Sequence, residues 1–91
     1  MDPLLLGIDI GTTNIKAIVF DPQGKTVAST SVKTPTHYPR PNWAYYVPDE
    51  IWTQTVTAIK QTVSQIAQPQ RIVSVAVTSM AESAVPIDAQ G

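Results

Sequence analysis

Residues 4–20 read LLLGIDIGTTNIKAIVF, and this stretch decides the fold. Its first part, residues 4–10, is a nearly unbroken apolar run, which is typical of a central strand buried on both faces. A Gly-Thr-Thr turn at residues 11–13 follows, and the β-branched residues of Asn14–Asp21 predict a second strand. One carboxylate, Asp9, interrupts the apolar run close to the turn.

The turn after the second strand is equally clear. Residues 21–24 read DPQG, in which proline presets the backbone of the second position and glycine closes the turn. Residues 25–33 then alternate small polar residues with a few apolar ones and carry Lys25 and Lys33 at the two ends. Such a thinly apolar strand suits the edge of a sheet. Three strands joined by tight turns predict an antiparallel meander.

Residues 34–48 form a segment rich in proline and aromatic side chains. Its length exceeds the usual connection between elements, and its aromatic content predicts a loop packed on another part of the molecule. We expect Trp43 in this segment, like Trp52 beyond it, to serve packing rather than chemistry. His37 is expected to be structural or exposed, since it is the only histidine and one histidine cannot hold a zinc ion by itself.

A helical period begins at Asp49. Apolar residues recur at positions 52, 56, 59, 63 and 66, which makes one apolar stripe along a helix. Pro48 suits the first turn, the acidic residues favour the helix N-terminus through the helix dipole, and Pro69 predicts the end of the helix. The helix contains several threonines, so we expect its stability to come from docking rather than from intrinsic propensity.

The remaining chain adds two strands. Residues 71–78 read RIVSVAVT, another strand of the buried type, and residues 84–88 predict a short final strand. A strand that follows a helix is expected to join the sheet in a parallel position. The predicted order is β-β-β-α-β-β, an α/β mixed sheet with one helix. One helix cannot cover both faces of such a sheet, so one face is left uncovered. We expect further chain or a second copy of the protein to pack on it.

The composition excludes several classes of function. A chain of 91 residues with 43% hydrophobic residues suits one small globular domain. The net charge of −1 gives no broad basic surface for nucleic acid or an anionic membrane, and no cysteine is present for a disulfide or a thiolate metal site. No apolar run reaches the roughly 20 residues of a membrane span, and the N-terminus does not read as a signal peptide, so a cytoplasmic protein is expected.

The candidate metal-binding and phosphate-binding residues are Asp9 and those of the turn that follows it. A carboxylate near the end of a buried strand is costly unless it is paired, hydrogen-bonded or bound to a metal. Oxygen ligands suit Mg²⁺, whereas the N–H groups of a glycine turn, threonine hydroxyls and a lysine such as Lys16 suit phosphate oxygens. The alternative is that Asp9 only caps the Gly-Thr-Thr turn, which is common turn chemistry. Spacing alone favours neither interpretation.

The segment DIGTT at residues 9–13 resembles the first phosphate motif of the actin-like, ribonuclease-H-like ATPase superfamily, which includes sugar kinases, heat-shock chaperones and actin. Its continuation resembles one branch, the FGGY carbohydrate kinases. The matching segments follow in order and at the right spacing: KAIVFDPQG at residues 16–24, NW at 42–43, PDEIW at 48–52, and the strand and turn of 72–91. The DPQG turn and the spacing of the two tryptophans favour the kinases over a chaperone or actin-like nucleotide switch.

The resemblance implies ATP and Mg²⁺ as cofactors. It implies that Asp9 is the catalytic contact to the Mg²⁺, through water. It also implies that the cofactor-binding residues Gly11, Thr12 and Thr13 line the phosphates, with Lys16 nearby.

The resemblance also implies a substrate-facing turn at Met80, Ala81 and Glu82. Glu82 falls where relatives place a polar side chain on sugar or polyol hydroxyls, and a carboxylate acceptor suits paired hydroxyls. The alternative for Glu82 is a solvated loop acid. Met80 and Ala81 match neither the Gln-Arg of glycerol kinases nor the Gln-Met of xylulose kinases, so the sequence names no particular sugar. A further departure is Val47, where the family has an Asp able to cap the helix; either Asp49 takes over the cap or the first turn frays.

By this resemblance, residues 1–91 are the N-terminal part of the first, sugar-binding domain of a kinase whose catalytic base and second, nucleotide-binding domain are absent from the chain. The expected reaction of the complete protein is ATP- and Mg-dependent phosphorylation of a sugar or polyol hydroxyl, with no nucleic-acid or membrane partner. Phosphoryl transfer needs the reacting groups held in line across a closed cleft, so the isolated chain is expected to be inactive. The alternative is a stand-alone remnant or self-assembling module without catalysis, which forms a homo-dimer through the uncovered sheet face.

Overall fold

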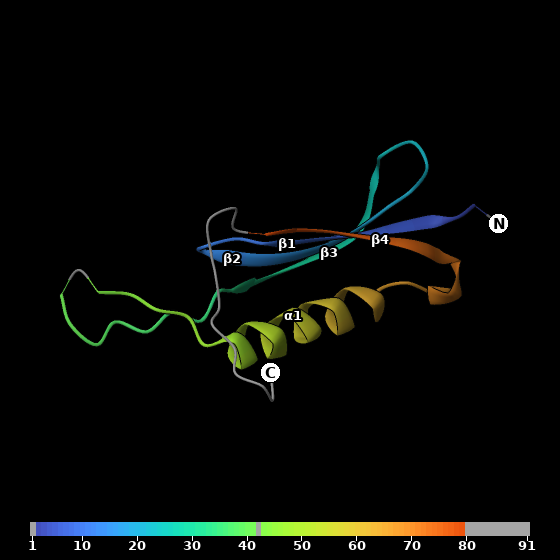
Figure 1. Cartoon of the computed structure of the whole chain (residues 1–91). Helices are drawn as coiled ribbons and strands as arrows, with labels where there is room; N and C mark the ends of the chain where they lie inside the picture. The colour runs from blue at the N-terminus through green and yellow to red at the C-terminus, as the bar shows by residue number, and fades with distance from the viewer. Residues whose placement is uncertain (1, 42, 80–91) are drawn as a thin grey trace, which may run out of the picture.

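The computed structural model describes residues 2–41 and 43–79. The elements are β1 (Leu4–Ile10), β2 (Asn14–Phe20), β3 (Thr26–Lys33), α1 (Pro48–Val63), the 3₁₀ turn η1 (Pro69–Arg71) and β4 (Ile72–Ser79). The four strands form one sheet in the order β3-β2-β1-β4, and α1 lies on one face of it (Figure 1). The predicted final strand at residues 84–88 lies outside the described residues.

The first three strands form the predicted antiparallel meander. In the turn between β2 and β3, the Asp21 carboxylate accepts hydrogen bonds from the N–H groups of Gln23 and Lys25, at 3.0 and 2.9 Å. Gly24 in this turn has a φ of +84°, a left-handed conformation that favours glycine. β3 lies at an edge of the sheet, which confirms the prediction from its thin apolar content.

β4 pairs with β1 in parallel, after the chain has passed over the sheet as α1. This confirms the predicted parallel position. The register pairs Ile10 with Ser79, so β1 and β4 end side by side. The turn at residues 11–13 starts at the same end of the sheet.

The core lies between α1 and the sheet. On β1 and β2 the buried side chains alternate with exposed or half-buried ones, as expected when one face of a strand points to the core. Among residues 2–41 and 43–79, the buried apolar residues of the core are Leu4, Leu6, Ile8, Ile15, Ala17, Val19, Ala28, Ala58 and Ile66.

The helix face that docks on the sheet differs from the predicted stripe. Thr55, Ala58 and Thr62 are the buried residues of α1, whereas Trp52 is 66% exposed and the other apolar positions of the predicted stripe within the helix are half-buried. The buried threonine hydroxyls donate to carbonyls of the preceding helical turn, from Thr55 to Ile51 at 2.7 Å and from Thr62 to Ala58 at 2.8 Å. Burial therefore leaves neither hydroxyl unpaired, and these small side chains let the helix lie close to the sheet.

The ends of α1 also depart from expectation. Of the two alternatives for the start of the helix, a cap at Asp49 is wrong, because the N-cap is Val47, whose side chain makes no capping hydrogen bond. The Val47 carbonyl still accepts the first helical hydrogen bonds, and Pro48 has no N–H to satisfy. The helix ends at Val63, before Pro69 is reached. No helix within residues 2–41 and 43–79 is long and apolar enough to cross a lipid bilayer.

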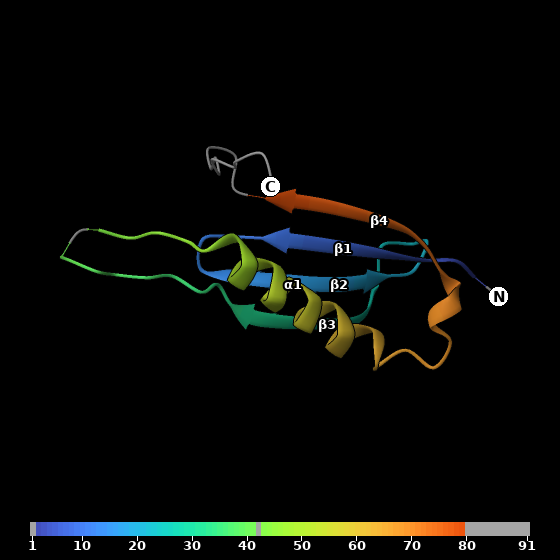
Figure 2. The same cartoon turned by 60° about the horizontal axis from the view of Figure 1, so that its bottom comes forward.

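Apolar side chains are uncovered on both faces of the sheet. On the face away from α1, Leu5 is 42% exposed, as predicted for a sheet with a single helix. Val73, Val75 and Val77 of β4 are exposed by 67%, 57% and 58%. The register sets Val75 and Val77 beside the buried Leu6 and Ile8, which places these two valines on the α1 face, whereas Val73 falls at an irregularity of the pairing. Among the described residues, α1 lies over β2 and β3 and not over β4 (Figure 2). The uncovered surface is therefore larger than predicted.

The loop at residues 34–47 extends away from the sheet (Figures 1 and 2). The predicted packing of its aromatic residues on another part of the molecule is wrong for Tyr38 and Trp43, which are 75% and 60% exposed. Instead the loop is closed on itself. His37 and Tyr45 exchange backbone hydrogen bonds of 2.9 and 3.0 Å, and their rings stack with centroids 4.9 Å apart.

Candidate functional site

The turn between β1 and β2, at Gly11–Thr13, lies at the end of the sheet where β4 also ends. The Gly11 N–H donates to the Asn14 carbonyl at 2.9 Å and closes the turn. A Cβ atom on Gly11 would lie 2.9 Å from the same oxygen, closer than real Cβ atoms approach a neighbour, so this position requires glycine. Thr12 and Thr13 are exposed and present their hydroxyls at the surface of the turn.

Asp9 lies in β1, two residues before the turn. The sheet register sets Lys16 of β2 directly beside it on one side and Thr78 of β4 on the other. Paired residues of neighbouring strands point to the same face, so the three polar side chains form a row on the sheet face opposite α1. Thr78 Oγ1 donates to Asp9 Oδ1 at 3.1 Å. All three residues are exposed, so a ligand can reach the row.

The contact with Thr78 bears on the two interpretations of Asp9. Within residues 2–41 and 43–79, the Asp9 carboxylate bonds to a β4 hydroxyl and not to an N–H group of the turn. The turn is closed instead by the backbone of Gly11 and Asn14. No described contact of Asp9 therefore supports the interpretation that this residue serves only to cap the turn.

The groups present fit Mg²⁺ and phosphate. Carboxylate and hydroxyl oxygens are hard ligands, and Mg²⁺ is usually held by one or two carboxylates together with waters and substrate phosphates. The described part of the chain contains no cluster of three His, Cys, Asp or Glu side chains, so it offers no closed protein cage for a metal. An exposed carboxylate beside a glycine turn is compatible with a metal ion shared with phosphates.

A hollow of about 130 Å³ adjoins the turn and brings in residues that the sequence reading missed. An antiparallel meander returns the end of β3 to the start of β2, and the register pairs Lys33 with Asn14. The predicted meander could have identified these residues, because it places the residues after the third strand beside the turn between the first two strands. The lining residues are Thr12, Thr13, Lys33, Thr34, Thr36 and Tyr38.

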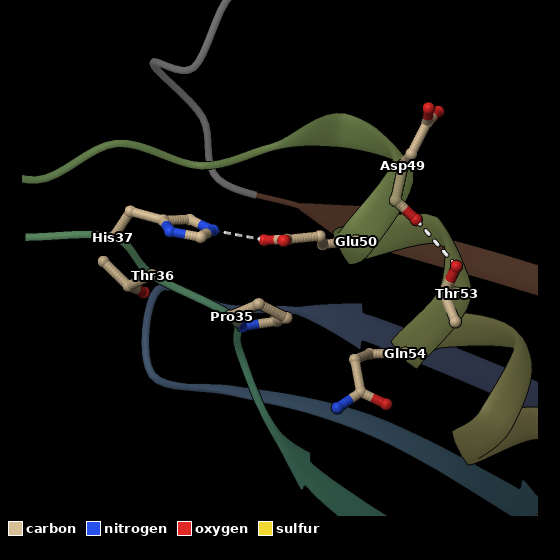
Figure 3. A pocket seen from close by; sticks show the side chains of 7 residues that line it. All are labelled: Pro35, Thr36, His37, Asp49, Glu50, Thr53 and Gln54. Carbon is tan, nitrogen blue, oxygen red and sulfur yellow. Dashed lines mark hydrogen bonds and ion pairs between the residues drawn. The ribbon is translucent and has the colours of Figure 1, made fainter.

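A larger hollow of about 620 Å³ lies between the loop and the first turns of α1 (Figure 3). Two contacts join its polar groups: the His37 ring contacts the Glu50 carboxylate, and Thr53 Oγ1 donates to the Asp49 carbonyl at 2.9 Å. The Asp49 carboxylate points away from the His37–Glu50 pair (Figure 3). No set of side chains converges on a ligand there. The lining residues are Pro35, Thr36, His37, Asp49, Glu50, Thr53 and Gln54.

The structure thus brings together the residues predicted for the phosphates and the metal at one end of the sheet. The residues predicted for the substrate, Met80, Ala81 and Glu82, lie outside the described residues. The residue before them, Ser79, is the last of β4.

Comparison with known proteins points to one family. Residues 4–91 match the sequence profile described as the FGGY family of carbohydrate kinases, N-terminal domain. The glycerol kinase of Thermococcus onnurineus (strain NA1) is 35% identical over 92 residues, which cover 100% of this chain and 19% of that protein. The chain therefore spans about a fifth of the length of the curated relatives it matches.

Solved structures of sugar kinases share the fold. The xylulose kinase from Rhodospirillum rubrum superposes with a TM-score of 0.87 at 28% identity, covering 97% of this chain and 18% of that one. The gluconate kinase from Lactobacillus acidophilus gives a TM-score of 0.76 at 26% identity, covering 87% of this chain and 16% of that one. These likenesses confirm the predicted ribonuclease-H-like, actin-like ATPase fold of the mixed sheet. The names of these proteins specify different sugars and polyols.

Proposed function

Because the chain belongs to the FGGY family of carbohydrate kinases, we propose that it forms the N-terminal part of the first, sugar-binding domain of a longer enzyme. The complete enzyme transfers the γ-phosphoryl group of ATP to a hydroxyl of a sugar or polyol, with Mg²⁺. One observation carries this proposal beyond the family match. Asp9 and Lys16, one acidic and one basic residue, are directly opposite each other on neighbouring strands, next to a turn that requires glycine at Gly11.

Each residue of this group acts on charge or position. Phosphoryl transfer leaves little covalent chemistry to the protein, so catalysis rests on alignment of the reactants and on neutralisation of the phosphate charge. We assign the hydroxyls and N–H groups of Thr12 and Thr13 to the phosphate oxygens, and Lys16 to their negative charge. Asp9 holds Mg²⁺ through its water shell, and the bound ion supplies further charge neutralisation.

The sugar side of the site is assigned to the turn after β4. We propose that Glu82 accepts hydrogen bonds from neighbouring hydroxyls of the substrate, with Met80 and Ala81 beside it. The relatives named as glycerol, xylulose and gluconate kinases support a polyhydroxy substrate class.

The 91-residue chain by itself is proposed to be inactive. It covers 19% of the glycerol kinase to which it aligns, and phosphoryl transfer depends on groups that close over the reactants from both sides. ADP formation by the pure chain with any of these three substrates would contradict this part of the proposal.

The test uses the protein translated from the complete reading frame, supplied with Mg·ATP and a panel of glycerol, xylulose and gluconate, with ADP release as the readout. One of these or a related polyol should stimulate ADP release in the wild type. Asp9→Asn should lower kcat by about 100-fold or more, since catalytic electrostatic contacts are commonly of this size. Asp49→Asn is the matched control, because Asp49 is an exposed carboxylate in the first turn of α1 and should leave kcat unchanged. Near-normal turnover of Asp9→Asn would refute the role given to Asp9.

A second candidate is a self-assembling module without catalysis. It is favoured by the uncovered valines of β4, Val73, Val75 and Val77, which lie on a strand at the edge of the described sheet. Sedimentation velocity of the 91-residue chain at micromolar concentration tests it. A dimer that Val75→Lys converts to monomer would support this candidate, whereas a sharp monomer peak of the folded wild-type chain would count against it.

A further inference from the structure

Thr34 follows directly after β3 and is one of three buried polar residues in the described chain, with 2% exposure. Its hydroxyl donates to the Gly11 carbonyl at 2.7 Å, and its backbone N–H donates to the Thr13 carbonyl at 2.9 Å. The two carbonyls are the first and last of the β1–β2 turn. A single residue from another strand end therefore holds both ends of this turn.

These two hydrogen bonds have a consequence for ligand binding. They occupy carbonyl oxygens, whose partial negative charge would repel a phosphate. In the described part of the chain, neither the Thr12 N–H nor the Thr13 N–H donates to a backbone carbonyl outside the strand ladders. N–H groups of a tight turn that point outward together form a site for anions.

We propose that Thr34 is a positioning residue that holds the Gly11–Thr13 turn in the conformation that receives the phosphates of ATP. This inference rests on the proposed kinase function and assigns a role within the same site. Thr34 acts through the turn, because its hydroxyl is taken up by the Gly11 carbonyl.

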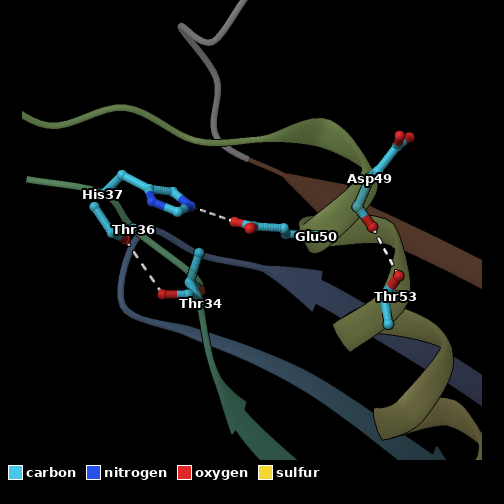
Figure 4. A network of polar contacts seen from close by, with 6 residues as sticks. All are labelled: Thr34, Thr36, His37, Asp49, Glu50 and Thr53. Atoms are coloured by element: carbon cyan, nitrogen blue, oxygen red, sulfur yellow. Dashed lines mark hydrogen bonds and ion pairs between the residues drawn. The ribbon is translucent and has the colours of Figure 1, made fainter.

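The segment that carries Thr34 is itself held in place (Figure 4). Thr36 Oγ1 donates to the Thr34 carbonyl at 3.2 Å, and the His37 ring contacts the Glu50 carboxylate of α1. Pro35 restricts the backbone of the residue before it to extended conformations. The chain of contacts thus runs from α1 through Thr34 to the turn, and the position of the turn is coupled to the docking of the helix.

The first experiment measures steady-state kinetics of the full-length kinase with ATP as the varied substrate. Thr34→Val keeps the shape of the side chain and removes the hydroxyl. It should lower kcat/KM for ATP by about tenfold or more, because the Gly11 carbonyl loses its partner and the turn relaxes. The KM for the sugar should change less than about twofold, and Thr34→Ser should restore kcat/KM to within about threefold of the wild type.

The matched control is Thr62→Val, which removes an equally buried hydroxyl that bonds to the carbonyls of Ala58 and of Ala17 in β2, at 2.8 and 3.3 Å, and not to the Gly11–Thr13 turn. It should reduce thermal stability as much as Thr34→Val does while leaving kcat/KM for ATP unchanged. Equal losses of kcat/KM in the two valine variants would show that Thr34 serves general stability, and would overturn the inference. Kinetics of Thr34→Val within twofold of the wild type would overturn it as well.

The second experiment needs no activity and separates this inference from the proposed function. Amide hydrogen exchange on the 91-residue chain follows the Gly11 N–H, which bonds to Asn14, against strand amides such as Ile8 and Val19. In Thr34→Val, exchange at Gly11 should rise about tenfold more than at the strand amides, and Thr34→Ser should not show this difference. A uniform change would refute the hold of Thr34 on the turn. If the difference is seen but the full-length wild type shows no sugar-dependent ADP release, the proposed function fails while the hold of Thr34 on the turn stands.

Discussion

Gly11→Ala is the substitution whose outcome the structure specifies most closely. The added Cβ would lie 2.9 Å from the Asn14 carbonyl oxygen, which is a backbone atom and cannot rotate away. The same oxygen accepts the hydrogen bond from the Gly11 N–H that closes the turn, at 2.9 Å. The turn cannot open freely either, because Thr34 Oγ1 holds the Gly11 carbonyl at 2.7 Å. Relief of the contact must therefore weaken at least one of these two hydrogen bonds.

The size of the effect follows from these contacts. Weakening one hydrogen bond contributes about 0.5–1.5 kcal/mol, and forcing a methyl group into filled space costs about 1–3 kcal/mol. Together these contributions predict that Gly11→Ala lowers the free energy of unfolding of the 91-residue chain by about 1.5–4.5 kcal/mol. In the full-length kinase it should also raise the KM for ATP by about tenfold or more, because the displaced turn carries the groups assigned to the phosphates.

Gly7→Ala, in β1 four residues before Gly11, provides the comparison. There the nearest atom to an added Cβ is Phe20 Cε2 at 3.3 Å, the far end of a side chain that can shift. Its free energy of unfolding should change by less than about 1 kcal/mol, since alanine also loses less conformational freedom than glycine on folding. Urea denaturation measures both variants, and ATP kinetics measures function. Equal denaturation midpoints and equal KM values for the two variants would refute the argument that the turn is closed around Gly11.

Three further predictions concern other parts of the chain. Lys16→Met should raise the KM for ATP about tenfold in steady-state kinetics, as expected for loss of a charged hydrogen-bonding group. Lys33→Met should raise the KM for ATP less, and its effect should decrease at high salt. A larger effect of Lys33→Met would assign the phosphate contact to Lys33 instead of Lys16. Ala58→Leu should lower the free energy of unfolding by about 1–3 kcal/mol, because that position is fully buried against the sheet, and an unchanged denaturation midpoint would mean that α1 docks by another face. His37→Ala should change global stability by less than about 1 kcal/mol, as for exposed ion pairs, but should speed proteolysis within the loop by releasing it from Glu50; unaltered cleavage rates would show that the pair does not hold the loop.

The strand layout could be predicted from sequence because its determinants are local. Apolar runs of strand length, a DPQG turn and an edge strand thin in apolar residues are each visible within a few positions, and their order leaves few topologies. The docking face of α1 could not be predicted this way. A hydropathy pattern does not identify threonine as a buried residue. Thr55 and Thr62 can nevertheless be buried, because each hydroxyl donates to the carbonyl four residues earlier. The prediction that the aromatic residues of the loop pack on another part of the molecule was wrong for a related reason. Composition indicates that aromatic side chains tend to be buried, but it does not identify the surface that would bury them.

The candidate site was predictable only as far as one strand and its turn. The motif that holds Asp9 and Gly11 is contiguous, so the sequence shows it directly. Lys33 lies beside the turn through the pairing of β3 with β2, and Thr34 through its hydrogen bonds to Gly11 and Thr13. The meander predicts which strands are neighbours, but the particular residues that meet the turn follow only from the register. A threonine followed by proline at a strand end carries no signal of its own.

The register that forms the site is also the register that buries the core. Because side chains alternate between the two faces of a strand, the pairing that sets Asp9 beside Lys16 also turns Ile15 and Ala17 toward α1, where both have 0% exposure. A shift of this pairing by one position would exchange the faces of the β2 side chains. Lys16 would then point into the core or lose its place beside Asp9, and the buried residues of β2 would meet water. The register that keeps Ile15 and Ala17 buried therefore also keeps positions 9 and 16 beside each other on the opposite face, so the geometry of the site depends on the same strand pairing as the stability of the sheet.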